Sequence, residues 1–161
     1  MISGLSTLTT IHTLLSIVAL LSGVPVITGL LRGVRSSGWF WIFWVTATAT
    51  SVTGFFFPFH GVTPAIGVGI VALIILALVL MAAPGVQRSR MSSFIYSSGL
   101  VASEYFLVFV AIAQAFVKIA VLHAAAPTLK EPLFAIAQLV AVAIFVLLGI
   151  LATKKRKALV L

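Results

Sequence analysis

The sequence contains no cysteine and no aspartate, and Glu104 and Glu131 are its two acidic residues. Without cysteine the chain cannot form disulfides, thiolate metal sites, iron–sulfur clusters or thioether links to haem. Without aspartate no Ser-His-Asp set can be assembled. Glycine-rich phosphate loops and metalloprotease motifs are missing as well. Hydrolysis and phosphoryl transfer are not indicated, and an enzyme is the less favoured class of function, although an intramembrane isomerase or oxidoreductase stays open.

Charge is also scarce, because charged residues make up 7% of the 161 residues and hydrophobic residues make up 62%. A soluble domain of this size would need polar side chains over most of its surface. The composition instead predicts an all-α fold, a polytopic transmembrane helical bundle that forms one domain over residues 1–161. The net charge of +8 does not indicate a nucleic-acid partner, because the basic residues gather at the ends of apolar runs.

Five apolar stretches approach the length of about 20 residues that a membrane-spanning helix needs. We place them at about residues 9–31, 39–58, 63–84, 98–123 and 133–153. Eight of the ten basic residues follow the first, third and fifth stretches: Arg32, Arg35, Arg88, Arg90, Lys154, Lys155, Arg156 and Lys157. The connections on the opposite side carry only Lys130. The positive-inside rule therefore predicts five spans with the N-terminus outside and the C-terminus cytoplasmic, and basic loops next to anionic lipid.

The second predicted span opens with three tryptophans and continues with a row of hydroxyl residues. Trp39, Trp41 and Trp44 follow a basic loop, where an aromatic belt is expected at the cytoplasmic interface. Thr46 and Thr50 begin a stripe of small and hydroxyl side chains. Such a stripe is typical of helices that pack closely and hydrogen-bond across their interface.

The fourth predicted span contains Glu104, Gln114 and Lys118, which are costly residues within lipid. Glu104 and Lys118 project within about 40° of each other around the helix but lie about 21 Å apart along it. They therefore cannot pair. We expect Arg88 or Arg90 to reach Glu104, about 9 Å inside the start of the span, and Lys118 to extend toward Glu131 or the following loop. Two hypotheses follow: bundle-facing residues that fix helix register, or a proton or ion pathway.

The predicted topology gathers four potential ligands near the outer face of the membrane. They are His12, His60, His123 and Glu131. Imidazole and carboxylate groups bind divalent metals such as zinc or copper, and two imidazoles can ligate a haem. The spacings form no local motif, so hydrogen-bonding histidines at the interface and pH sensing are alternatives.

Several segments resemble a family of small uncharacterised bacterial inner-membrane proteins. The resemblance rests on Thr50–Phe59 with Thr63–Ala65, on Gln114–Lys118, and on Ala126–Pro132 with Ala137 and Gln138. It covers most of the chain, but the family reads Thr-Gln-Ser-Glu-Pro-Pro where this chain has Thr-Leu-Lys-Glu-Pro-Leu. The resemblance implies a bacterial inner membrane and matches Lys118 and Glu131 to family motif positions. It implies no activity.

Three functions are compatible with these observations. The favoured hypothesis is a non-catalytic membrane subunit or scaffold that packs against partner helices, as a homo-oligomer or within a larger complex. The second is a redox protein that binds haem or a divalent metal through the outer histidines. The third is a small proton-linked transporter that uses Glu104, Gln114 and Lys118.

Overall fold

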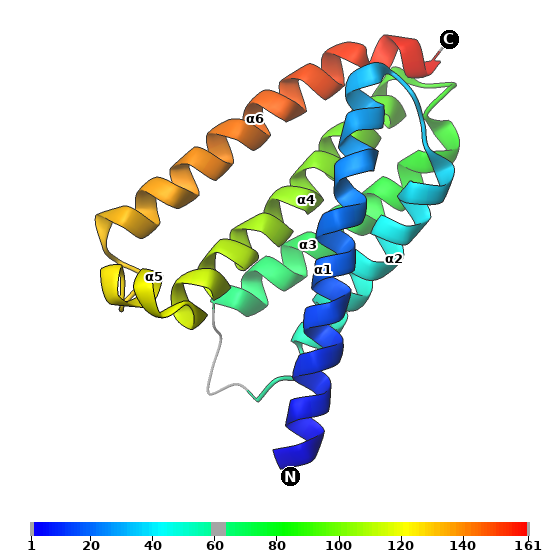
Figure 1. Ribbon diagram of the computed structural model, residues 1–161. Helices are drawn as coiled ribbons and strands as arrows, with labels where there is room; N and C mark the ends of the chain where they lie inside the picture. The colour runs from blue at the N-terminus through cyan, green and yellow to red at the C-terminus, as the bar shows by residue number, and fades with distance from the viewer. Residues whose placement is uncertain (1, 59–63, 161) are drawn as a thin grey trace.

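The computed structural model describes residues 2–58 and 64–160, and all regular structure in these ranges is helical. The helices follow one another in an up-and-down bundle (Figure 1). Their bounds are α1 Ile2–Arg32, α2 Ser37–Gly54, α3 Pro64–Ala82, the 3₁₀ turn η1 Ala83–Gly85, α4 Arg90–Lys118, α5 Ala120–Ala125 and α6 Pro132–Val160. The predicted all-α class is confirmed.

Four helices are long and apolar enough to cross a membrane. The qualifying segments are Thr7–Arg32, Ile66–Gly85, Arg90–Lys118 and Pro132–Lys155. They correspond to the first, third, fourth and fifth predicted spans. Helix α2 has 18 residues and a length of about 27 Å, but it is less apolar because it carries tryptophans and hydroxyl residues. The chain thus has the helix content of a multi-pass membrane protein.

Several helix ends differ from the predicted span ends. Helix α2 ends at Gly54 and not at residue 58. Helix α4 begins eight residues before the predicted start at residue 98 and ends at Lys118 and not at residue 123. The start was not predicted because the first turns of α4 contain several polar residues and so do not belong to an apolar run. The Ser89 side chain caps the helix by accepting a hydrogen bond from Ser92 N–H. The end was missed because the break at Ile119 lies in an apolar stretch without glycine or proline.

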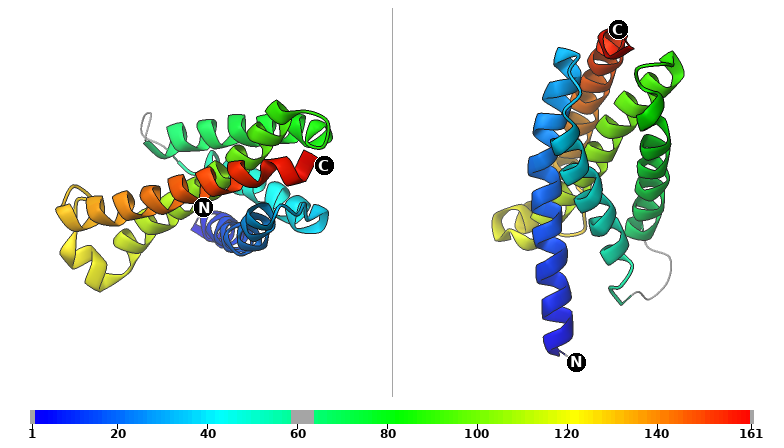
Figure 2. Two further views of the ribbon diagram at one scale, coloured as in Figure 1. Left: turned by 90° about the horizontal axis from the view of Figure 1, so that it is seen from above. Right: turned by 90° about the vertical axis from the view of Figure 1, so that its right-hand side faces the viewer.

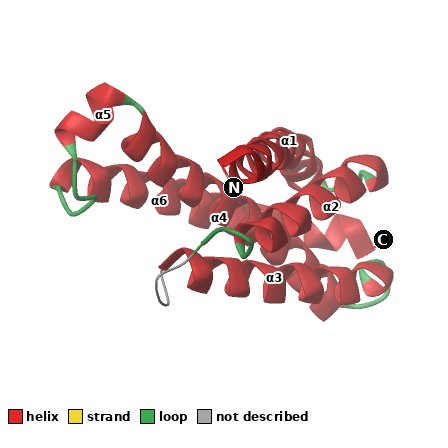
Figure 3. Cartoon of the chain, turned by 90° about the horizontal axis from the view of Figure 1, so that it is seen from below, coloured by secondary structure: helices red, strands yellow, loops and turns green. Residues whose placement is uncertain are grey.

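Helix α4 is the central element, because it contacts α1, α3 and α6 (Figures 1 and 2). Helix α1 also contacts α2 and α6. The α1–α2 connection, the turn before α4 and the C-terminal end of α6 lie at one end of the bundle, which we call the basic end (Figure 1). Helix α5 projects at the other end, on the side away from α2 (Figure 3). The chain therefore brings its separate basic segments together at one end.

Arg35 joins two connections at the basic end. Its guanidinium donates to the carbonyl oxygen of Ala83 over 2.9 Å and lies 5.3 Å from the centre of the Tyr96 ring. Trp44 similarly joins α2 to α3 by donating to the carbonyl oxygen of Leu76 over 2.9 Å. Trp39 and Trp41 are exposed, as expected of belt residues, whereas Trp44 is half-buried and ties two helices together.

The hydrophobic core is concentrated in the half of the bundle next to the basic end. Its largest fully buried apolar side chains are Tyr96, Phe40, Phe43, Leu30, Leu76, Leu100, Val79 and Val86. Close approach of α3 and α4 there requires Gly99, since a Cβ at this position would overlap Val79. On α4 the buried residues run from Ser93 to Glu104, and the next one is Phe116. Glu104 therefore stands where the tightly packed part of the bundle ends.

Candidate functional site

Glu104 is buried at the middle of α4, with 4% of its surface exposed. Fourteen residues separate it from Arg90 and fourteen from Lys118, so each end of the helix is about 21 Å away. The expected pairing with Arg88 or Arg90 is wrong, because the early start of α4 moves both arginines out of reach. A carboxyl group thus lies at the depth where a spanning helix tolerates charge least.

Gly23 of α1 makes the room for this carboxyl group. A Cβ built at Gly23 would overlap the carboxyl group of Glu104. The neighbouring residue Ser22 is buried, and its hydroxyl donates to the carbonyl oxygen of Ala19 over 3.0 Å. With glycine at this position α1 approaches α4 closely while the glutamate lies between them, whereas a larger residue would require the Glu104 carboxyl group to move. The Glu104 carboxyl is therefore held between two helix backbones.

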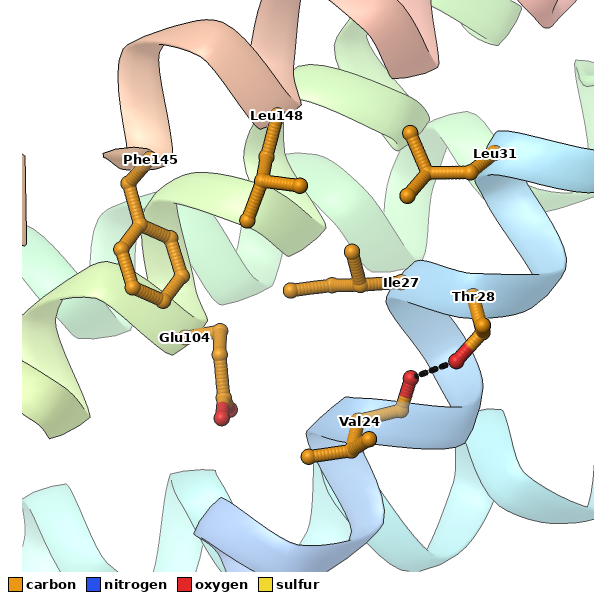
Figure 4. Close-up of a pocket in the computed structure, with 7 residues that line it drawn as sticks. All are labelled: Val24, Ile27, Thr28, Leu31, Glu104, Phe145 and Leu148. Carbon is orange, nitrogen blue, oxygen red and sulfur yellow. Dashed lines mark hydrogen bonds between the residues drawn. The ribbon is translucent and has the colours of Figure 1, made fainter. Parts of the chain in front are cut away.

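No polar partner of the carboxyl group is found among the described residues. The Oε2 atom is buried without a hydrogen-bond partner, and the described residues offer the group no ion pair. It faces a cavity of about 210 Å³ between α1, α4 and α6, shown in Figure 4. The lining residues are Val24, Ile27, Thr28, Leu31, Glu104, Phe145 and Leu148. The one hydroxyl among them, on Thr28, donates to the carbonyl oxygen of Val24.

An ionised carboxylate in such surroundings lacks a counter-charge, and burial of an unpaired charge is strongly unfavourable. The group must be compensated by a proton or by a cation that enters the cavity. The site can therefore exchange one positive charge for another. The described surroundings supply no nucleophile, second carboxylate or activating base for covalent chemistry.

Two buried hydroxyl groups lie on α4 near Glu104. Ser97 projects from the same side of the helix as Glu104 and Ser103 from a side about 100° away, and their Oγ atoms have no hydrogen-bond partner among the described residues. Leu100, which is fully buried, separates Ser97 from Glu104 along this face. From Ser97 to Glu104 is about 10 Å along the axis, too far for one hydrogen bond. These hydroxyls do not form a continuous polar route from the basic end.

Gln114 and Lys118 lie on the C-terminal half of α4 and are exposed. Neither lines the cavity at Glu104. Their helix extends toward α5, beyond the part of the bundle where α1 and α4 pack closely (Figure 1). The structure thus brings Glu104 together with α1 and α6, and not with the other two residues of the predicted pathway.

His12 belongs to the contact between α1 and the end of α2. Its Nδ1 atom lies 2.9 Å from the Thr53 hydroxyl oxygen, and its ring meets the Phe57 ring edge to face, with centroids 5.2 Å apart. The Thr53 hydroxyl donates to the carbonyl oxygen of Ala49 over 2.8 Å, so Nδ1–H of His12 donates to Thr53. His12 therefore helps to join α1 and α2.

The predicted metal or haem site is only partly described. His123 lies exposed on α5, and His60 lies outside the described residues. Within the described ranges no group of three or more metal-binding side chains comes together. The four-residue set stays a prediction.

Glu131 is bound to its own loop. Its carboxylate accepts from the Thr128 hydroxyl at 2.8 Å, from Thr128 N–H at 3.2 Å and from Lys130 N–H at 3.0 Å. Desolvation raises the pKa of Glu131, but the hydrogen bonds from the Thr128 hydroxyl and from backbone amides outweigh it and lower the pKa below its ordinary value. The predicted contact of Lys118 with Glu131 is not among these bonds. Glu131 instead fixes the loop that leads into α6.

No sequence pattern indicated which residues of α1 and α6 line the cavity. The position of Gly23 beside Glu104 had a sequence signal. Ser22 and Gly23 are adjacent small residues within an apolar run, and such residues allow close helix contacts. Phe145 and Leu148 carried no signal, since they are ordinary apolar residues of a spanning helix. Their role depends on which face of α6 meets α1.

Comparison of the chain with protein-family models, with curated proteins and with solved structures finds no match. The similarity to small bacterial inner-membrane proteins therefore stays a prediction. The function has to be inferred from the site at Glu104.

Proposed function

We propose that the protein is a small proton-linked membrane carrier whose ion-binding group is Glu104. One observation carries this proposal: an acidic side chain at the middle of an apolar helix is buried without a partner and faces a cavity. Ionisable residues at that depth are costly and mark proton or ion sites in membrane proteins. The proposal makes Glu104 the group that binds and releases the coupling proton.

The scaffold hypothesis accounts less well for this site. A polar residue that only fixes helix register is stabilising when its hydrogen bonds are satisfied, whereas an unsatisfied one costs free energy. Glu104 makes no such bonds with the described residues, and its carboxyl group lies where a Cβ at position 23 would be. The redox hypothesis keeps its four predicted ligands, but the cavity gives it no support.

Infrared difference spectroscopy tests the proposal on the full-length protein in lipid nanodiscs. A protonated carboxylic acid has a carbonyl stretching band that disappears when the group ionises and shifts in deuterated water. We expect such a band to titrate with pH in the wild-type protein and to be missing in Glu104→Gln. The matched control is Glu131→Gln, which changes the other acidic residue and should keep the band.

A wild-type protein without any titrating buried carboxylic acid would overturn the proposal. The same holds if the band survives in Glu104→Gln and is lost in Glu131→Gln. A scaffold predicts a carboxyl group that keeps one protonation state across the stability range of the protein. Thermal unfolding of both variants, measured alongside, establishes that each spectrum comes from folded protein.

We further propose that the chain crosses the bacterial inner membrane five times, with the N-terminus outside and the basic end next to anionic lipid in the cytoplasm. Helix α2 is antiparallel to α1 and has a length of about 27 Å, close to the hydrocarbon thickness of about 30 Å. Its hydroxyls reduce the cost of burial by bonding carbonyls of their own helix, as Thr46 does with Ile42 and Ser51 with Ala47. The basic segments at one end also favour this topology.

Single cysteines test the topology, since the natural chain has none. Five crossings predict that Ala125→Cys reacts with a membrane-impermeant maleimide in cells with a permeabilised outer membrane. Val34→Cys and Gln87→Cys should react only after the inner membrane is opened. If α2 does not cross, Gln87→Cys reacts from outside and Ala125→Cys does not, which would exclude the five-span proposal.

A further inference from the structure

We infer that the cavity at Glu104 binds the ammonium group of an amphiphilic cation that enters from the lipid between α1 and α6. This inference rests on the proposed function and names the ligand class of the same site. It depends on three properties of the cavity: where it opens, which charge it lacks and how large it is.

The cavity opens on the side of the bundle. Val24 at its edge is 61% exposed, and Thr28, one turn further along α1, is also exposed. Both project from α1 beside the cavity (Figure 4), and in a helix long and apolar enough to cross a membrane we expect such exposed positions to face lipid. Toward the basic end the core closes the way, because Leu100 and Leu30 are almost completely buried. A ligand dissolved in the bilayer therefore has the shortest route to the carboxyl group.

Among the described residues that line the cavity, Glu104 is the one with a titratable side chain. On α1 the nearest charged or titratable groups are Arg32 and His12, about 13 Å and 16 Å along the axis from Gly23. On α6 the nearest is Lys154, about 9 Å along the axis from Leu148. Helices α2 and α3 carry none.

On α4 itself the nearest titratable group is Tyr105. Its ring packs against Phe109 and Phe145, with centroids 6.1 Å and 5.8 Å apart, and it does not line the cavity. No cation of the described chain therefore compensates Glu104. A ligand cation would pair with this carboxylate, and the apolar lining matches a hydrocarbon body.

The volume limits how much of the ligand fits. About 210 Å³ is less than the roughly 300 Å³ at which pockets for drug-sized ligands begin. The cavity accommodates a head group and its first methylenes, while the rest of the chain lies along α1 and α6 in the lipid. The Phe145 ring on the cavity wall adds an aromatic surface, which is favourable for ammonium groups.

Binding at this site exchanges charges. The cation enters as the Glu104 carboxylic acid releases its proton to solvent, so one positive charge replaces another and no covalent bond other than O–H breaks. The buried site stays neutral in both states. Coupling of cation movement to proton movement follows directly, because both ligands need the same carboxyl group.

Calorimetry with dodecyltrimethylammonium tests this inference, since the charge of this probe does not change with pH. The wild-type protein and its variants are titrated in nanodiscs, and the heat of empty nanodiscs is subtracted. We expect saturable binding and release of one proton per cation, measured from the heats in two buffers of different ionisation enthalpy. Glu104→Gln should weaken binding at least about tenfold, which corresponds to about 1.4 kcal/mol.

Two controls separate the cavity from general uptake into lipid. Glu131→Gln should bind the probe like the wild type, whereas Leu148→Trp, which fills the cavity, should bind it more weakly while keeping Glu104. Dodecanol, which has the same chain without the charge, should not compete. Equal binding by wild type, Glu104→Gln and Leu148→Trp would overturn the inference, and so would competition by dodecanol.

The calorimetric test of the ligand and the infrared test of the proton site can give different results. If the infrared band of Glu104 titrates but the probe does not bind, the proton site stands and the ligand class is wrong. If the band does not titrate at all, the proposed function itself fails.

Discussion

The two glutamates of this chain occupy opposite environments. Glu104 is buried at mid-helix, has no hydrogen-bond partner and touches a glycine of the neighbouring helix. Glu131 precedes α6 in a loop and accepts three hydrogen bonds from Thr128 and Lys130. The hydrogen-bonding partners of Glu131 come from its own loop, whereas the described residues provide no hydrogen-bonding partner for Glu104.

The different environments of the two glutamates indicate different roles, although the residue type is the same. The carboxylate of Glu131 stabilises a loop and the N-terminus of α6, where a negative charge is favourable. Glu104 makes no stabilising contact that the structure shows, and its carboxyl group occupies the space that a Cβ at position 23 would fill. A group that costs stability and requires a specialised neighbour is best explained by what it binds.

Closing the space at Glu104 should have the largest effect on the protein. Gly23→Ala puts a methyl group on the carboxyl position, and overpacking of this kind costs about 1–3 kcal/mol. We therefore expect Gly23→Ala to lower the unfolding free energy by that amount and to abolish the titrating infrared band or shift it. Thermal or denaturant unfolding in a fixed detergent measures the first effect.

A double-mutant cycle shows whether the cost comes from this contact. Glu104→Ala removes the carboxyl group, so adding Gly23→Ala to it should cost much less than in the wild type. Gly67→Ala on α3 is the control, because a Cβ there meets nothing within 4 Å, and it should not destabilise the protein. Equal costs of Gly23→Ala in both backgrounds would show that Glu104 does not occupy this space.

Much of the fold was predictable because apolar length is a strong signal in membrane helices. The predicted spans 9–31 and 133–153 lie within the candidate membrane-spanning segments of α1 and α6. The boundaries of α4 were not predictable in the same way. Its first two turns are polar, and its end at Lys118 depends on a backbone change at Ile119 that no breaking residue marks.

The site was predictable in part. Glu104 stood out because charge is rare within an apolar run. The lack of a partner for Glu104 was not predictable. An arginine at position 88 or 90 could reach Glu104 only if the helix started at residue 98, as the apolar run indicated. The cavity depends on how α1 crosses α4 and α6, a long-range property that periodicity along one helix does not contain.

Removal of the Glu131 carboxylate should affect only the loop before α6. Glu131→Ala removes the acceptor for the Thr128 and Lys130 amides, so both should exchange hydrogen several-fold faster. Exchange in the middle of α4 should stay unchanged, because nothing there touches the loop. Hydrogen exchange followed by mass spectrometry or NMR measures both regions, and Glu104→Ala is the matched control. Faster exchange in both regions would mean that the two acids are coupled through the bundle.

The smallest expected effect is a dependence of stability on pH through Glu131. The folded loop lowers the pKa of this group from its ordinary value of 4.5, so the ionised form is favoured in the folded state. Its contribution is complete above the ordinary pKa and is lost as the pH falls through the lower folded value. In acid the melting temperature of Glu131→Gln should therefore fall less than that of the wild type, while the two proteins differ by a constant amount near neutral pH. Thermal unfolding across this acid range measures the difference, with Glu104→Gln as the parallel variant. Identical acid sensitivity of wild type and Glu131→Gln would show that the loop hydrogen bonds do not distinguish the ionised carboxylate from a neutral amide.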